Sequence, residues 1–92
     1  MKTGSQRRDY RARKQDMLNK MSDITDSVAN YVNKYSETDM AQAIIEVYFG
    51  KPFHVPLNQC VFPGTNEIDW DKAEENLAIM RNKLEFIREL CK

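Results

Sequence analysis

The sequence predicts an all-α domain in the order long helix, short helix, long proline-containing loop and long helix. Residues 5–35 contain neither glycine nor proline, so no helix-breaking residue interrupts this stretch. Two long stretches carry apolar residues at alternating intervals of three and four, which is the repeat of helices that pack lengthwise on a partner. All three prolines fall within residues 50–68. The length of 92 residues is that of one small domain, which we assign to residues 1–92.

The first long helix is expected to run from about residue 5 to residue 35, with a basic end over residues 1–20. Its apolar repeat comprises Met17, Met21, Ile24, Val28, Tyr31 and Tyr35. Continued towards the N-terminus, the repeat passes through Lys14 and Tyr10. This spacing places the apolar residues on one face, and it therefore predicts a seam that packs along a second helix.

A short second helix is expected over residues 37–49. Ser36 is placed to cap its start, and Asp39 follows at the third position of a capping box. Gly50 is expected to end the helix in the left-handed conformation, and Pro52 forbids its continuation. The predicted apolar face comprises Met40, Ala43, Ile44, Val47 and Tyr48.

Residues 50–68 form a loop that is long for so small a domain. Pro63 and Gly64 are expected at the centre of a turn. The large apolar residues of the loop are expected to be at least partly buried and to hold it against the helices; they include Phe53, Val55, Leu57 and Phe62. The alternative is an exposed apolar loop that serves as a docking site.

The last helix is expected over residues 70–91. Asp69 can cap its first turn, and Ile68 and Ala73 can form a hydrophobic staple across the cap. The apolar repeat of this helix comprises Trp70, Ala73, Leu77, Met80, Leu84, Ile87 and Cys91. A second apolar stripe, on another face, comprises Ile79, Phe86 and Leu90.

The two continuous apolar repeats predict that the long helices pack on each other, and we expect them to be antiparallel, as a helical hairpin or bundle. The second stripe of the last helix needs a further neighbour, which can be the short helix, the loop or a second chain. Because a small domain buries a limited share of its surface, we expect self-association, most simply as a homodimer.

Charge is distributed unevenly along the chain, although the formal net charge is zero. Residues 1–20 contain seven basic and two acidic residues, whereas residues 21–92 contain seven basic and twelve acidic residues. Such a basic end can bind an acidic protein surface or a phosphate backbone, or it can be only a solvated helix end. The candidate residues for binding a partner or nucleic acid are Arg7, Arg8, Arg11, Arg13, Lys14 and Gln15.

The same basic end contains the stretch QRRDYRARKQ, residues 6–15. It resembles the arginine-rich helix of the lambdoid phage N antitermination proteins, which binds a short RNA hairpin. The matching positions are Arg7, Arg8, Arg11, Ala12, Lys14 and Gln15, with Asp9 as the acidic equivalent. The match covers ten of 92 residues, and it departs from the family at Tyr10, where the family has arginine, and at Leu18, where it has an aromatic residue. The resemblance implies RNA binding by this end of the chain and a phage-like origin.

The chain is expected not to be an enzyme and to bind no cofactor or metal. His54 is its one histidine, and no nucleophile or carboxylate lies at a spacing typical of catalysis. Cys60 and Cys91 form no Cys-x-x-Cys pair, and we expect two free thiols. No apolar run approaches about 18 residues and no signal peptide is recognisable, so a cytoplasmic protein without a membrane span is expected.

These observations favour a small, non-enzymatic, intracellular binding protein. Its size and its lack of catalytic groups fit a phage- or mobile-element-encoded protein that modulates or inhibits a host macromolecular complex by docking on a protein. The alternative is a regulator that binds RNA or DNA with the basic N-terminal helix.

Overall fold

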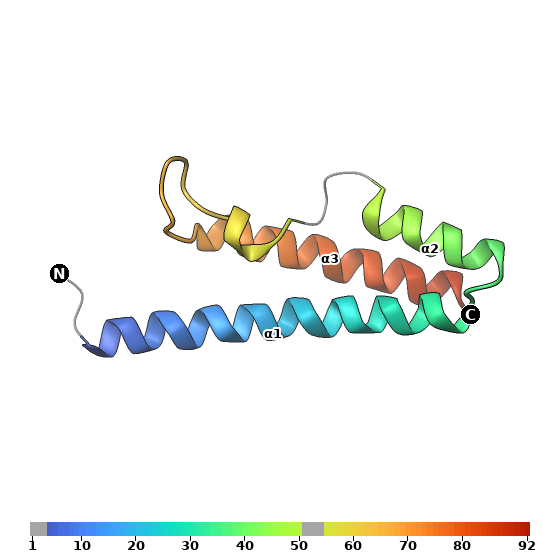
Figure 1. The fold of residues 1–92 in the computed structure, drawn as a ribbon, viewed down its shortest axis with the longest axis horizontal. Coiled ribbons are helices and arrows are strands. Elements are labelled where there is room, and N and C mark those ends of the chain that lie inside the picture. Colours follow the sequence, from blue (N-terminus) through green and yellow to red (C-terminus); the bar gives the residue numbers. More distant parts are fainter. Residues whose placement is uncertain (1–3, 51–54) are drawn as a thin grey trace.

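A computed structural model describes residues 4–50 and 55–92, and the side chains of residues 8–50 and 55–92. The helices are α1 (Gly4–Lys34), α2 (Asp39–Phe49) and α3 (Trp70–Leu90), and a single 3-10 turn, η1 (Leu57–Gln59), lies in the loop (Figure 1). The molecule is elongated and measures 54 × 23 × 18 Å. The predicted all-α fold, with its order of long, short and long helices, is confirmed.

The long helices α1 and α3 run parallel to each other, so the predicted antiparallel arrangement is wrong (Figure 1). At one end the Tyr10 ring packs edge-on against Trp70, with 5.9 Å between ring centroids. At the other end the Tyr35 hydroxyl donates a hydrogen bond to the Cys91 carbonyl at 3.3 Å. The reason is the path of the connecting chain. After α2, the chain returns to the N-terminal end of α1 before α3 begins, so α3 must run in the same direction as α1.

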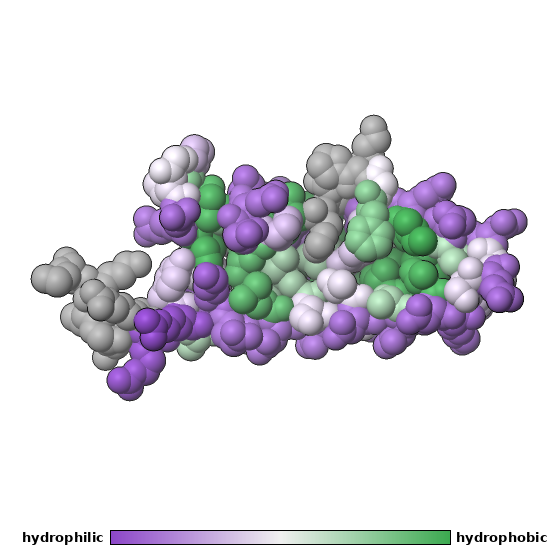
Figure 2. Space-filling view, in the orientation of Figure 1, coloured by the Kyte–Doolittle hydropathy of each residue, from purple (hydrophilic) through white to green (hydrophobic). Residues whose placement is uncertain are grey.

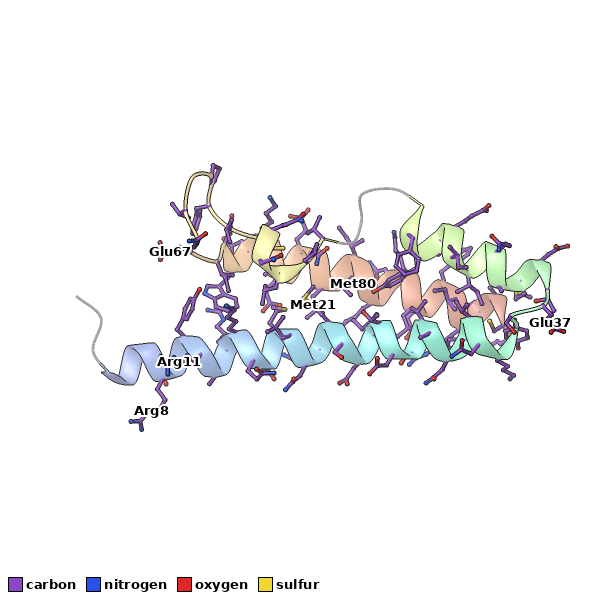
Figure 3. All side chains as sticks on the ribbon, viewed as in Figure 1. Arg8, Arg11, Met21, Glu37, Glu67 and Met80 are labelled. Atoms are coloured by element: carbon purple, nitrogen blue, oxygen red, sulfur yellow. The ribbon has the colours of Figure 1, made fainter. Side chains whose placement is uncertain are left out.

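The seams of α1 and α3 face each other inside one chain and form its core. Figure 3 places Met21 and Met80 between the two helices. The seam residues that are buried are Met17, Met21, Ile24, Val28, Ala73, Leu77, Met80, Leu84 and Ile87, whereas Tyr31 and Trp70 are half-buried against them. The seams therefore supply a core within a single chain, and self-association stays a prediction.

The start and end of α2 differ from the sequence prediction. Thr38, not Ser36, is the N-cap residue, and its hydroxyl donates to the Tyr35 carbonyl at 2.7 Å instead of capping α2. Gly50 ends the helix with a φ of −81°, so the predicted left-handed conformation is wrong. The need for glycine has another cause, because a β carbon at this position would overlap the carbonyl of Glu46.

The buried face of α2 is centred on Ile44 and Tyr48, which are fully buried. Ala41 completes this face, while Ala43, which was predicted to lie on it, is only half-buried. The Tyr48 hydroxyl lies 3.3 Å from the Thr25 hydroxyl of α1, which itself donates to the Met21 carbonyl at 2.9 Å. Since Thr25 has used its proton, Tyr48 is the donor between the two hydroxyls. Burial raises the pKa of Tyr48 above its ordinary value.

The loop is held against the helices by Leu57 and Cys60, which are buried, and by the half-buried Val55. Phe62 is 45% exposed, so it is partly buried, as predicted, but it is the most exposed of the described apolar residues expected to hold the loop. It is the first residue of the turn that Thr65 closes, and it lines a depression together with Tyr10 and Trp70. Phe53 lies outside the described residues.

The two local signals at the end of the loop are confirmed. Thr65 donates its backbone N–H to the Phe62 carbonyl at 3.0 Å, which closes a turn with Pro63 and Gly64 at its centre. Gly64 has a φ of 79°, a conformation that favours glycine. Asp69 caps α3 by accepting a hydrogen bond from the Lys72 backbone N–H at 3.2 Å.

Candidate docking surfaces

The basic end of α1 presents three solvated cations, Arg8, Arg11 and Lys14, which we call the basic ridge. They lie at intervals of three residues, so they are neighbours on the helix surface. Each is exposed, and none forms an ion pair within the part of the chain that the structure describes. Figure 3 shows Arg8 pointing away from α3. Arg7 belongs to α1, but its side chain lies outside the described set.

The other two predicted binding residues of this end are engaged with the protein itself. The Arg13 guanidinium carbon lies 4.2 Å from the centroid of the Trp70 ring, which is a cation–π distance. The Gln15 amide donates to the Asn19 side chain at 2.9 Å, one helical turn further along α1. Arg13 therefore links the first turn of α3 to α1, and partner binding by the six predicted residues stays a prediction.

Replacing Arg13 by glutamine is expected to lower the free energy of unfolding by about 0.5–1 kcal/mol, because the exposed cation–π contact with Trp70 is lost. Urea unfolding followed by circular dichroism measures the change. The control is Arg11→Gln, which removes an equally basic residue two positions away with no ring contact. An Arg13 effect no larger than the Arg11 effect would contradict the structural role.

An apolar groove runs between α2 and α3, and we call it the α2–α3 groove. Its volume is about 380 Å³, and the described residues that line it are Val47, Ile79, Asn82, Lys83 and Phe86. Phe86 is 57% exposed at this groove, and with Ile79 and Val47 it forms an apolar patch. Ile79 and Phe86 belong to the second apolar stripe of α3, so this stripe is only partly covered by α2.

Lys83 forms the polar wall of the groove. Its ammonium donates a hydrogen bond to the Tyr48 carbonyl at 3.2 Å. That carbonyl lies near the C-terminal end of α2, where the helix dipole favours a cation. Partial burial of the ammonium lowers the pKa of Lys83. The contact with the Tyr48 carbonyl places the charge at the groove.

A second apolar depression, of about 300 Å³, lies on the other side of α2, between α1 and α2. It is lined by Thr25, Val28, Ala29, Val32, Asn33, Ile45 and Phe49, and Phe49 is 57% exposed. The short helix is therefore flanked by apolar surface on both sides, and Figure 2 shows such surface around α2 on one face. The lower edge in the same view, along the outer face of α1, is hydrophilic.

The apolar stripe of the last helix predicts Ile79 and Phe86, but nothing in the sequence analysis placed Val47 and Lys83 beside them in one groove. Val47 packs partly against the core, as predicted for the apolar face of α2, and also lines the groove. A signal for Lys83 was present, because it lies four residues after Ile79 and three before Phe86 and hence on the same helix face.

Residues typical of catalytic or metal sites are not gathered in the described part of the chain. No group of three or more histidine, cysteine or acidic residues there could hold a metal ion. Cys60 and Cys91 are free, as predicted, and burial raises the pKa of the Cys60 thiol. His54 lies outside the described residues. None of the described helices combines the length and the apolarity that crossing a membrane requires.

Together these features define a small all-α protein with an apolar groove beside its short helix and a basic end on its longest helix. No protein-family model, no curated protein and no solved structure matches the chain. The resemblance of residues 6–15 to the arginine-rich helix of the N antitermination proteins stays a prediction.

Proposed function

We propose that this protein is a non-enzymatic binding protein that docks on another protein through the α2–α3 groove. The observation that carries the proposal is Phe86, which is 57% exposed beside Ile79 and Val47 although the same helix buries five of its seam residues completely or nearly so. Exposed aromatic residues that line an apolar depression are typical of protein interfaces. Docking of this kind would let the protein modulate or inhibit the complex that it joins.

The experiment is capture of a partner from a host lysate by the immobilised full-length protein, with and without nuclease. A captured protein that survives nuclease treatment is then purified, and its affinity is measured for the wild type and for Phe86→Ser. We expect the variant to bind about 30-fold more weakly, as for an aromatic hot spot worth about 2 kcal/mol.

The matched control is Phe62→Ser, since Phe62 is also an exposed phenylalanine but lies on the turn before α3. Neither replacement empties the core, so both variants should keep the wild-type circular dichroism spectrum. Equal affinities of Phe86→Ser and the wild type would refute docking through this groove.

The second candidate function is nucleic-acid binding by the basic ridge, which is favoured by the exposure of Arg8, Arg11 and Lys14. In that case capture would depend on intact nucleic acid, and replacing the three residues together by glutamine would abolish it. The logarithm of affinity would also fall with the logarithm of salt concentration by about 0.9 for each phosphate neutralised on duplex DNA. Nuclease-resistant capture that the triple variant leaves unchanged would eliminate this candidate.

A further inference from the structure

We propose that the occupant of the α2–α3 groove is an amphipathic helix of another protein that carries carboxylates beside its apolar stripe. This inference rests on the proposed function, because it names the chemistry of the partner that docks there. Three properties of the groove lead to it: the spacing of its apolar residues, the charge of its wall and the poor fit of a second copy of the chain.

The apolar residues of the groove have the spacing of a helical partner. Ile79 and Phe86 are seven residues apart, which corresponds to about 10.5 Å along α3 at 1.5 Å per residue. A partner helix that lies along α3 repeats its own apolar side chains at the same interval of seven. Val47 of α2 supplies the opposite wall. The groove can therefore receive the side chains at positions i, i+3, i+4 and i+7 of one helix, which is the common mode of helix recognition.

The charge of the groove selects among such helices. Lys83 is the ionisable residue among the described groove-lining residues, and it lies between Ile79 and Phe86 along the helix face. Its contact with the Tyr48 carbonyl keeps the ammonium at the groove wall. A carboxylate on the partner would meet this ammonium in surroundings less polar than bulk water, where opposite charges attract more strongly. A lysine or arginine at the same place would be repelled.

A second copy of the chain fits the groove less well. A two-fold pairing of α3 with its copy can place Ile79 against Phe86 of the other chain only if the axis passes between Asn82 and Lys83. The two Lys83 ammonium groups would then lie close together in a partly dehydrated site. Like charges at that position oppose the pairing, whereas the carboxylates of an acidic helix would be attracted to the same ammonium.

The test uses two synthetic 18-residue helical peptides with the same leucine stripe at positions i, i+3, i+4 and i+7. One carries glutamate beside the stripe and the other carries lysine at the same positions. Binding of each to the full-length protein is measured by fluorescence anisotropy at low and high salt. We expect the glutamate peptide to bind at least about fivefold more tightly, which corresponds to about 1 kcal/mol, with the preference shrinking at high salt.

Two variants assign this preference to the groove. Lys83→Glu is expected to reverse it, and Phe86→Ser is expected to abolish binding of both peptides. Because Lys83→Glu places a carboxylate near the C-terminal end of α2, its fold is checked by circular dichroism. If it does not fold, Lys83→Gln replaces it, and the preference should then disappear.

Each other outcome overturns the inference. Equal binding of the two peptides would be consistent with docking of a helix in the groove but would refute the preference for an acidic partner. A preference that survives replacement of Lys83 would place the selecting charge elsewhere. Absence of binding by either peptide would refute a helical occupant, while the Phe86 dependence of the captured partner still tests the proposed function separately. A dimer in sedimentation that Phe86→Ser dissociates would identify a second copy as the occupant.

Discussion

Replacing Ile44 by alanine is expected to lower the free energy of unfolding by about 2–5 kcal/mol. The Ile44 side chain is fully buried on the face by which α2 packs on α1 and α3. Removing its outer carbons leaves a cavity and forfeits apolar burial, and the surrounding residues can close such a cavity only in part. For a chain of this size the melting temperature should fall by about 8 °C or more.

The matched control for this prediction is Ile45→Ala. Ile45 has the same chemistry and is the next residue of α2, but it is only half-buried and lines the depression between α1 and α2. Its replacement should cost well under half as much. Urea unfolding followed by circular dichroism gives both values, and an unchanged urea dependence of the free energy shows that the two variants expose the same surface on unfolding. Equal losses at the two positions would mean that α2 is not packed as the structure has it.

Asn76 is the second residue whose replacement should have a large effect. It is the one buried polar residue among those the structure describes, and it is 6% exposed. Its side-chain amide donates to the Val55 carbonyl at 2.9 Å, and its side-chain oxygen accepts from the Val55 backbone N–H at 3.2 Å. The Asn76 side chain thus satisfies both the N–H and the carbonyl of Val55, as the backbone of a neighbouring β-strand would.

Asn76→Leu keeps the size of the side chain but removes both partners of Val55. An unsatisfied buried backbone group costs about 1–3 kcal/mol, and two such groups are affected. We therefore expect a large loss of stability, measured by urea unfolding, together with faster proteolysis within residues 55–60 of the folded protein. The proteolytic effect distinguishes release of the loop from a general loss of stability.

Asn82→Leu is the control, because Asn82 is an exposed asparagine on the same helix. It should change the free energy of unfolding by no more than about 0.5 kcal/mol. Equal stabilities of Asn76→Leu and Asn82→Leu would show that the two hydrogen bonds between Asn76 and Val55 contribute nothing measurable. The loop would then be held by the burial of Leu57 and Cys60.

The features that were predictable from the sequence depend on residues a few positions apart. The seams of α1 and α3 follow from intervals of three and four, which place side chains on one helix face whatever the rest of the chain does. The turn at Pro63 and Gly64 and the cap at Asp69 follow equally from local backbone chemistry. In each case the interactions that favour the structure join residues no more than about one or two helical turns apart in the sequence.

The features that were not predictable depend on where distant segments meet. The direction of α3 relative to α1 follows from the start of α3 at Trp70 beside Tyr10, and the apolar repeats alone allow either direction. From the sequence alone, Arg13 is one of several cations in a basic stretch. Only the structure shows that its guanidinium lies over the ring of Trp70. From the sequence alone, Asn76 would be expected on the surface. In the structure it is buried because its side chain pairs with the backbone N–H and carbonyl of Val55.

The α2–α3 groove shows the same division. The second stripe of α3 is visible in the sequence through Ile79 and Phe86, because helical spacing places them on one face. How much of that stripe stays uncovered depends on the length and position of α2, which is only 11 residues long and lies beside it. The location of the Lys83 charge at the groove likewise depends on the Tyr48 carbonyl, 35 residues away along the chain. The spacing of apolar residues in the sequence therefore determines which of them share a helix face. The packing of distant elements determines which of them remain exposed to a partner.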